Sequence, residues 1–222
     1  MQEGHRQNVM NKAKHKGILL VISGFSGAGK GTLVKKLISE YDNYALSISM
    51  TTRNPRVGEE HGREYFFATK EEFEHKITED GFIEHACYCG NYYGTPKDYV
   101  ESMLAAGKDV ILEIEIQGAM KVKEQYPQAL LLFVVPPSAE ELKRRLIGRG
   151  TETEEVIDAR LKRAYEESQG IEQYDYLVIN DDLDRCVNEL HNIVLSEHNR
   201  PDRNEAFIEK IREELKSFSF EK

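Results

Sequence analysis

A glycine-rich segment at residues 24–32, with the sequence GFSGAGKGT, constrains the fold of this chain more than any other feature. It follows an apolar run at residues 18–22 and leads into an amphipathic run at residues 33–38. Consecutive backbone N–H groups in such a turn form a cradle for phosphate oxygens, and the start of the next helix adds the positive end of its dipole. The segment therefore predicts a strand, a phosphate-binding loop and a helix that bind a mononucleotide.

The lysine of this loop, Lys30, is expected to reach the outer phosphates of the nucleotide. Loops of this kind usually have Ser or Thr directly after the lysine, where the hydroxyl helps to hold magnesium. This chain has Gly31 there and carries the hydroxyl one place later, on Thr32. Because Mg²⁺ gives up its water reluctantly, we expect no direct protein ligand: substrate oxygens and waters would carry the ion, near Thr32.

Buried strands are predicted where apolar, β-branched residues form continuous runs. Three such runs lie at residues 17–23, 109–115 and 129–135, and a fourth strand is expected at residues 176–180. Runs of helical period separate them. Strands that alternate with helices indicate a parallel sheet covered on both faces. The sequence therefore predicts a three-layer α/β fold.

The composition changes near residue 47, and the changed segment ends before the predicted strand at residue 109. This part is rich in Tyr, Phe and Gly, and it contains short alternating pieces such as EYFF at residues 64–67 and FIEH at residues 82–85. Short pieces of this kind are typical of strands joined by turns. We interpret the segment as a small mixed β insert rather than as another βαβ unit.

Two basic helices are expected after about residue 138. Ser138 can cap a helix at residues 139–149, and Glu141 would complete a capping box with it. A second helix is expected from about Thr153. Basic side chains gather on this pair of helices: Lys143, Arg144, Arg145, Arg149, Arg160, Lys162 and Arg163. A solvated helix face is the better interpretation for Lys143, Arg144 and Lys162.

The composition argues against several classes of partner. The formal net charge of -9 disfavours nucleic acid, because binding to a phosphate backbone needs a basic face. No apolar run approaches the roughly 20 residues of a membrane-spanning helix, and the polar start lacks a signal-peptide pattern, so a cytoplasmic location is expected. The cysteines, Cys87, Cys89 and Cys186, form no CxxC pair, which favours a reducing compartment over a metal site.

A second phosphate site is predicted beside the insert. The stretch SMTTRNPR at residues 49–56 places Arg53 and Arg56 next to hydroxyl groups, and the fixed fork of arginine matches phosphate oxygens in pairs. The chain has no Asn-Lys-x-Asp stretch, since Asn180-Asp181-Asp182 lacks the lysine. This argues against a GTPase and for transfer between a donor and an acceptor.

Taken together, these segments resemble the guanylate kinase family. The motifs GFSGAGKGT, SMTTRNPR, GREYFF, FIEHA, GNYYGTP, LEIEIQG, PPS, GRGTETEE and VINDD follow the order and spacing of that family. The resemblance implies a P-loop kinase fold at residues 17–198, with a GMP-binding insert at about 47–104 and a helical lid at about 138–168. Residues 1–16 and 199–222 would be a polar tail and a charged helical tail.

The resemblance also implies the reaction, in which the γ-phosphoryl group of ATP passes to GMP with Mg²⁺ as cofactor, in purine nucleotide metabolism. It implies a role in catalysis for Lys30, Arg53, Arg149 and Arg160. ATP would be bound by Gly24, Phe25, Ser26, Gly27, Ala28, Gly29, Lys30, Gly31, Thr32 and Asn180. GMP would be bound by Ser49, Arg53, Arg56, Tyr65, Glu84, Tyr93, Thr95 and Glu115. Glu84 suits guanine on chemical grounds, because its two acceptor oxygens match the N1–H and 2-amino donors that adenine does not offer together.

Departures from the family pattern leave alternatives open. Glu113 and Glu115 stand where many relatives have Asp, and Phe25 stands where Pro is usual, a change expected to alter loop stiffness rather than chemistry. A guanylate-kinase-like scaffold that binds a protein partner is the main alternative, and another monophosphate kinase on the same fold is a third. The sequence does not separate a monomer from a homo-oligomer.

Overall fold

The computed structural model describes residues 16–88, 90–148 and 153–218. A five-stranded sheet with the order β2-β7-β1-β8-β9 forms its centre. All of its strand pairs are parallel, and its members are β1 Leu19–Gly24, β2 Tyr44–Leu46, β7 Asp109–Glu113, β8 Leu130–Val135 and β9 Tyr176–Ile179. The four predicted strands are confirmed. The sequence missed β2, which has only three residues.

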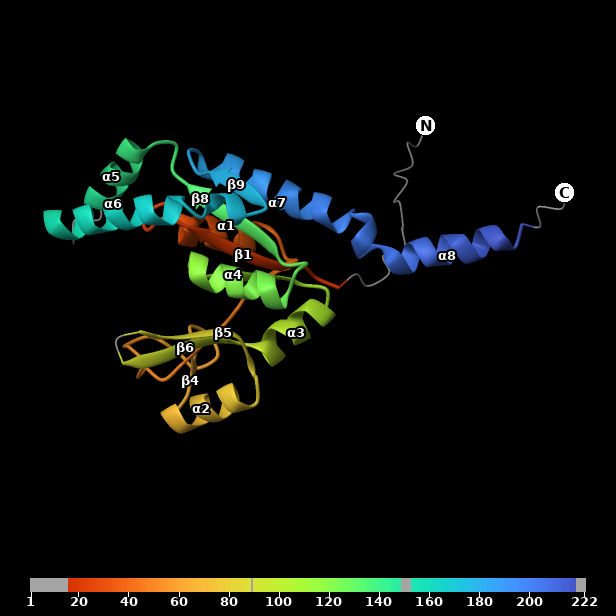
Figure 1. The fold of residues 1–222 in the computed structure, drawn as a ribbon, viewed down its shortest axis with the longest axis horizontal. Helices are drawn as coiled ribbons and strands as arrows, with labels where there is room; N and C mark the ends of the chain where they lie inside the picture. Colours follow the sequence, from red (N-terminus) through yellow and green to blue (C-terminus); the bar gives the residue numbers. More distant parts are fainter. Residues whose placement is uncertain (1–15, 89, 149–152, 219–222) are drawn as a thin grey trace, which may run out of the picture.

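Helices cover both faces of this sheet (Figure 1). Alternate residues of β1 point to opposite faces, so Leu20 and Ile22 pack with α1 and α7, whereas Leu19 and Val21 pack with α3 and α4. These helices are α1 Lys30–Glu40, α7 Leu183–His198, α3 Lys97–Ala105 and α4 Ile116–Gln125. The predicted three-layer α/β arrangement is confirmed.

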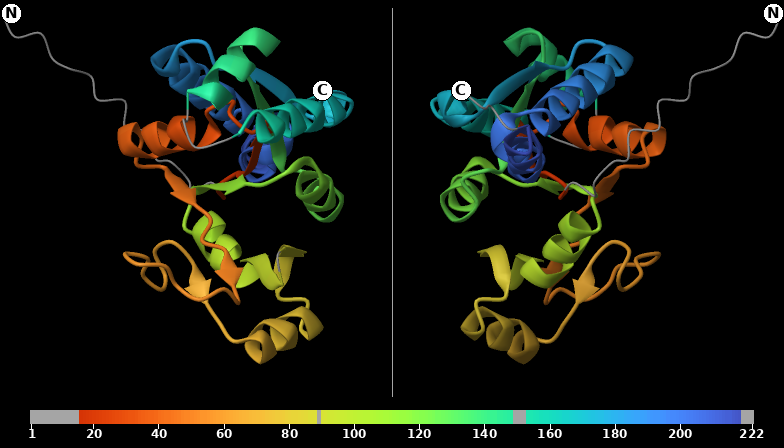
Figure 2. Two further views of the ribbon diagram at one scale, coloured as in Figure 1. Left: turned by 90° about the vertical axis from the view of Figure 1, so that its left-hand side faces the viewer. Right: turned by 90° about the vertical axis from the view of Figure 1, so that its right-hand side faces the viewer.

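The insert forms a separate small sheet that lies below the central sheet in Figures 1 and 2. Its strand order is β4-β3-β6-β5, and it is mixed because β3 and β4 are parallel while the other pairs are antiparallel. Phe73 stacks on Phe82 and Tyr92, with ring centroids 4.3 and 5.2 Å apart. The elements are β3 Met50–Thr51, β4 Phe66–Phe67, α2 Lys70–Thr78, β5 Phe82–Tyr88 and β6 Asn91–Pro96.

The two basic helices are α5 Ala139–Ile147 and α6 Glu154–Ser168. They share a small apolar cluster of their own, Leu142, Leu146, Ile157 and Ala164. The Ser138 hydroxyl accepts a hydrogen bond from the Glu141 N–H as predicted. The second half of the predicted capping box is wrong, because the Glu141 carboxylate pairs with Arg144 and Arg145 instead.

The described residues include two short 3₁₀ helices, η1 Ile171–Gln173 before β9 and η2 Pro201–Arg203 after α7. The helix that follows η2 is α8 Glu205–Lys216. Figure 1 shows α8 standing away from the layers that surround the sheet. Cys186 is a buried free thiol and Cys87 an exposed one, while Cys89 lies outside the described residues. Among the helices of the described ranges, none has both the length and the apolar character needed to cross a membrane.

Candidate active site

The glycine-rich loop joins the end of β1 to the first turn of α1. Gly24 has φ 152° and Gly29 has φ 92°, conformations that side chains rarely adopt. A Cβ atom on Gly24 would lie 2.2 Å from the Val134 carbonyl oxygen, and one on Gly29 would lie 2.5 Å from Asn180 Nδ2. The loop therefore follows a path that only glycine permits at these two positions.

Lys30 is the first residue of α1, and its ammonium turns back over the loop. Nζ donates to the carbonyl oxygens of Gly24 at 2.5 Å and Phe25 at 3.2 Å. Thr32 lies exposed in the same first turn of the helix. A positive charge and the N-terminal end of α1 thus lie on one side of the loop, which is the arrangement that attracts phosphate.

Asn180 and Arg145 support the loop from beneath. The Ala28 carbonyl oxygen accepts hydrogen bonds from Asn180 Nδ2 at 2.8 Å and from Arg145 Nη1 at 3.2 Å. Arg145 also donates to the Asn180 carbonyl oxygen at 2.8 Å and pairs with Glu141. The guanidinium groups of Arg144 and Arg145 lower the pKa of Glu141 to about 2. Sequence reasoning gave Arg145 no role, although its place one turn after Glu141 was visible.

The loop also contacts the two basic helices. Arg160 Nη1 of α6 donates to the Ser26 hydroxyl. The Phe25 ring meets Phe133 of the sheet edge-on, with centroids 5.2 Å apart, and packs against both the core and the α5–α6 cluster. Phe25 therefore joins three parts of the molecule: the glycine-rich loop, the core around the central sheet and the α5–α6 cluster. Arg149, the other predicted lid arginine, lies outside the described residues.

Glu113, the last residue of β7, and Glu115, two residues later, point to different places. A Cβ on Gly31 would lie 3.8 Å from Glu113 Oε1 and 3.9 Å from Oε2, so this carboxylate is close to the position where the usual hydroxyl is missing. The exposed Glu115 carboxylate instead accepts from Arg163 of α6 at 2.6 Å. The structure thus brings Glu113 to the glycine-rich loop and Glu115 to α6.

Arg53 of the insert is held by an acidic partner that the sequence did not reveal. Its Nη2 donates to both carboxylate oxygens of Glu59 at 3.0 Å, and the guanidinium lies 5.3 Å from the Tyr65 ring centroid. Glu59 also accepts from the Arg56 N–H at 2.8 Å. This backbone contact, followed by Arg53, lowers the pKa of Glu59. Glu59 lies in an irregular turn. Without the periodicity of a helix or strand, the sequence does not predict where its side chain points.

Aromatic rings complete the surroundings of Arg53. Tyr65 and Tyr93 meet edge to face, with ring centroids 6.1 Å apart. Tyr93 adds to the hydrogen bonding that raises the pKa of Arg53, although Glu59 is the largest cause. Arg56 is exposed. The structure therefore brings Arg53, Tyr65 and Tyr93 together, with Arg56 at the edge of the group.

Glu84 and Thr95 face each other across neighbouring strands of the insert. The buried Thr95 hydroxyl donates to Glu84 Oε1 at 2.8 Å, and the two residues are partners in the β5–β6 register. Burial raises the pKa of Glu84 above its ordinary value, and the Thr95 hydrogen bond opposes that shift. Ser49 lies beside β3, where its carbonyl oxygen accepts from the Phe66 N–H. A half-buried carboxylate with a fixed hydroxyl can recognise paired N–H donors.

Comparisons with known proteins agree with this arrangement. A family model described as Guanylate kinase matches residues 16–197. A guanylate kinase of Caldanaerobacter subterraneus subsp. tengcongensis is 53% identical over 201 residues, which cover 90% of this chain and 98% of the relative. One from Clostridioides difficile is 50% identical over 201 residues, with the same coverage. The crystal structure of guanylate kinase from Anaplasma phagocytophilum superposes with a TM-score of 0.66 at 34% identity, covering 85% of this chain and 90% of that one.

Proposed function

The chain belongs to the guanylate kinase family, whose members transfer the γ-phosphoryl group of ATP to GMP, and we propose that its own residues divide that reaction between the glycine-rich loop and the insert. The P-loop kinase fold implied by the resemblance is confirmed. The curated relatives are guanylate kinases, which supports the enzyme and gives no support to the scaffold alternative. One observation carries the proposal: Lys30, on the glycine-rich loop, and Arg53, in the insert, give two parts of one chain a positive charge suited to phosphate.

The donor end of the site comprises the loop and the lid. The backbone N–H groups of residues 24–32 would hold the ATP phosphates, Lys30 would contact the outer ones, and Asn180 would lie near the adenine. Arg149 and Arg160 would stabilise the charge on the phosphoryl group as it transfers. No general base is required, because the acceptor is already an anionic phosphate oxygen. Positioning supplies much of the rate.

The acceptor end comprises the insert, for which we propose bounds of about 47–104, with the lid at about 138–168. Arg53, Arg56, Tyr65 and Tyr93 would grip the GMP phosphate. Arg53 Nη2 already donates to Glu59 and Nη1 to the Asn54 carbonyl oxygen, so the guanidinium is oriented before GMP arrives. An oriented fork loses less rotamer entropy on binding a phosphate than a free one.

The guanine end of the acceptor site rests on Glu84. Its carboxylate would accept hydrogen bonds from guanine N1–H and the 2-amino group, while Ser49 and Thr95 place hydroxyls at the edge of the base. The Thr95 bond at 2.8 Å fixes one carboxylate oxygen in advance. A site that depends on such hydrogen bonds can reject the wrong base by about 10⁴ to 10⁵.

Magnesium fits the oxygen donors beside the loop. Mg²⁺ prefers oxygen ligands and retains several waters, and Glu113 places carboxylate oxygens next to Gly31 while Thr32 offers a hydroxyl. When bound with ATP, the ion would neutralise charge on the phosphate oxygens. We propose that Glu113 orients waters near Gly31, and that Glu115 contacts the guanosine side once Arg163 releases it.

A nucleotide screen tests this function directly. Purified protein is supplied with ATP, Mg²⁺ and either GMP, AMP or UMP, and ADP formation is followed by a coupled assay. We expect turnover with GMP and little with the other two acceptors. Turnover of AMP or UMP in preference to GMP would remove the base assignment to Glu84. Tight ATP binding by calorimetry without any turnover would favour a binding domain over an enzyme.

We place the reaction in purine nucleotide metabolism, where GMP is recycled to GDP, and in the cytoplasm. The two substrates, ATP and GMP, support this placement, because GMP and GDP are purine nucleotides. The insert and the lid would close on the core when both nucleotides bind, because water in the site would hydrolyse ATP instead of transferring its phosphoryl group. Scattering measurements with and without both nucleotides would show this closure as a decrease in the radius of gyration.

A further inference from the structure

Glu84, the carboxylate that we propose recognises guanine, lies against the core of the molecule as well as within the insert. It belongs to β5, and β5 contacts the core helix α4 (Figure 1). The Thr95 hydroxyl donates to Glu84 Oε1 at 2.8 Å, whereas none of the described residues donates to the second oxygen, Oε2. One oxygen of this carboxylate is therefore engaged already, and the other still lacks a donor.

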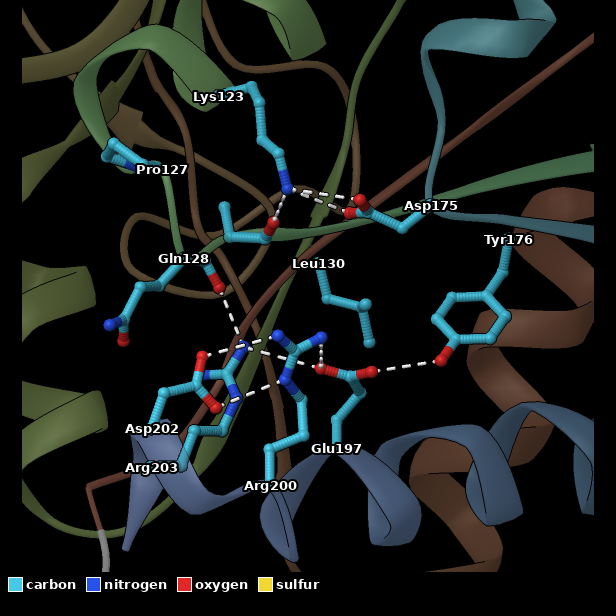
Figure 3. A pocket seen from close by; sticks show the side chains of 11 residues that line it. Lys123, Pro127, Gln128, Leu130, Asp175, Tyr176, Glu197, Arg200, Asp202 and Arg203 are labelled. Carbon is cyan, nitrogen blue, oxygen red and sulfur yellow. Dashed lines mark hydrogen bonds and ion pairs between the residues drawn. The ribbon is translucent and has the colours of Figure 1, made fainter. Parts of the chain in front are cut away.

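The cavity shown in Figure 3, of about 400 Å³, differs from this site because its charges are paired within the molecule. Three basic and three acidic side chains line it: Lys123, Arg200, Arg203, Asp175, Glu197 and Asp202. They form ion pairs with one another, so the cavity offers no excess charge to an ion. It also lies where β8 and β9 begin, whereas the glycine-rich loop follows the end of β1. The open oxygen of Glu84 is thus the better place to look for a ligand contact.

Gly118, the third residue of α4, lies beside this open oxygen. A Cβ atom on Gly118 would be 3.8 Å from Glu84 Oε2. Lys121 follows three residues later, on the same side of the helix. Burial is the main cause that raises the pKa of Glu84, and the charge of Lys121 is among the causes that oppose this shift. Both observations place one face of α4 against the Glu84 carboxylate.

Neither the backbone nor the packing of α4 explains why residue 118 is a glycine. Its φ lies outside the left-handed region that favours glycine, and Ala is a better helix former than Gly. The tightest contact of a Cβ atom would be with Ile114 Cδ1 at 3.3 Å. That atom is the free end of a partly buried side chain, so it can shift slightly. What the missing side chain leaves is space beside Glu84 Oε2.

We propose that Gly118 is a specificity-determining residue of the acceptor site, because it leaves room for the 2-amino group of guanine on Glu84 Oε2. This inference rests on the function proposed above. Guanine presents N1–H and the 2-amino group side by side, so Oε1, which keeps a lone pair beside the Thr95 bond, takes N1–H and Oε2 takes the amino group. A donor nitrogen approaches its acceptor to about 2.9 Å. A Cβ atom 3.8 Å from the same oxygen would crowd that nitrogen.

The substitution Gly118→Ala tests the proposal with two acceptors, GMP and inosine monophosphate, whose base keeps N1–H but lacks the 2-amino group. We expect kcat/KM for GMP to fall by about tenfold or more. The value for inosine monophosphate, measured at high enzyme concentration, should change by less than about twofold. The KM for ATP should stay the same, because the glycine-rich loop is not altered. The midpoint of urea denaturation should be no lower than in the wild type, since Ala favours the helix.

Gln117→Ala is the matched control on the same turn of α4. Gln117 is exposed and lines the gap between α4 and α6, together with Ala159 and Arg163. Its replacement should leave the kinetics with both acceptors unchanged. A second control combines Gly118→Ala with Glu84→Gln. In that background Gly118→Ala should add little to the loss for GMP, because the carboxylate that it serves is already gone.

Three results would overturn the role of Gly118. They are an unchanged kcat/KM for GMP in Gly118→Ala, equal losses for GMP and inosine monophosphate, and a loss that persists in full in the Glu84→Gln background. A lower denaturation midpoint together with a raised KM for ATP would assign Gly118 to the packing of α4 instead. A wild-type protein that does not phosphorylate GMP would overturn the proposed function itself, which separates that failure from the failure of this inference.

Discussion

The glycine-rich loop and the insert, which we propose bind the two phosphate groups of the reaction, are built by different means. The loop is a single stretch of chain whose shape comes from its backbone, with Gly24 and Gly29 at positive φ and one charged group, Lys30. The insert collects side chains from short strands and pairs each with a neighbour, as in Arg53 with Glu59 and Glu84 with Thr95. The first site depends on geometry that a Cβ atom destroys. The second depends on hydrogen-bond chemistry that single-atom changes alter.

The largest effect is expected where a side chain supplements the backbone-built site. Arg160→Met removes the guanidinium that reaches Ser26 from α6. If it acts on the transferred phosphoryl group as we propose, its loss should cost about 10³ or more in kcat. Steady-state kinetics with ATP and GMP measures it. Lys162→Met on the same helix is the matched control, because that side chain is exposed and predicted to be solvated. Equal losses in the two variants would show that the charge of the helix, rather than one arginine, matters.

A methyl group should break the loop where its backbone is closest to the sheet. In Gly24→Ala the new Cβ meets the Val134 carbonyl oxygen at 2.2 Å and φ is unfavourable, so we expect the free energy of unfolding to fall by about 2 kcal/mol or more and ATP affinity to drop. Urea denaturation and calorimetric titration with ATP measure the two effects. Gly31→Ala, whose Cβ has its nearest neighbour at 3.8 Å, should change both quantities far less. Similar losses in the two variants would contradict a path set by Gly24.

A change of one atom should be enough to damage the insert. Glu84→Gln replaces an acceptor with a donor and removes a charged hydrogen bond, so kcat/KM for GMP should fall by about 10- to 100-fold. The KM for ATP should stay within about twofold, since no loop geometry changes. Kinetics with each nucleotide varied in turn separates the two. Parallel losses for GMP and ATP would mean that Glu84 supports the structure rather than the base.

The pH profile sharpens the same test. Burial raises the pKa of Glu84, so the carboxylate gains its proton at a higher pH than an ordinary Glu and kcat/KM for GMP should fall early on the acid side. That limb should be absent from the Glu84→Gln variant. The effect of pH on stability has the opposite sign. Because the pKa of Glu84 is higher in the folded than in the unfolded state, protonation of Glu84 stabilises the fold at low pH. This contribution is lost as the pH rises through the folded pKa. The variant should therefore be no less stable than the wild type at neutral pH.

The smallest effect is expected at the ion pair between Glu115 and Arg163. Both side chains are largely exposed, at 74% and 56%, and pairs of this kind contribute about 0 to 1 kcal/mol. Arg163→Met should change the unfolding free energy by less than about 1 kcal/mol, while Glu115→Gln should raise the KM for GMP more than that of ATP. A stability loss comparable to that of Gly24→Ala would show that this contact holds α6 in place.

How far the sequence could predict these features depends on how local they are. The loop and Lys30 form one contiguous motif, so the sequence predicted them. The long strands were predicted because their residues form continuous apolar runs. β2, β3 and β4 have three, two and two residues, too few for any periodicity, so the insert was recognised without its strand pairing. The contacts of Arg145 with Ala28 and of Arg163 with Glu115 join residues 117 and 48 positions apart. Only the folded chain brings such pairs together.

Phe25 gives the proposed ATP loop a consequence for the timing of the reaction as well as for binding. Its ring packs on the sheet through Phe133 and on the apolar cluster of α5 and α6. Any movement that lifts those helices from the loop exposes part of this ring, and complete exposure of a Phe side chain costs about 1.5 to 3 kcal/mol. If α5 and α6 open and close as we propose, the ring would resist opening after the phosphoryl group has moved as well as before. The contact that keeps water from ATP in the proposed reaction would then also slow the departure of ADP.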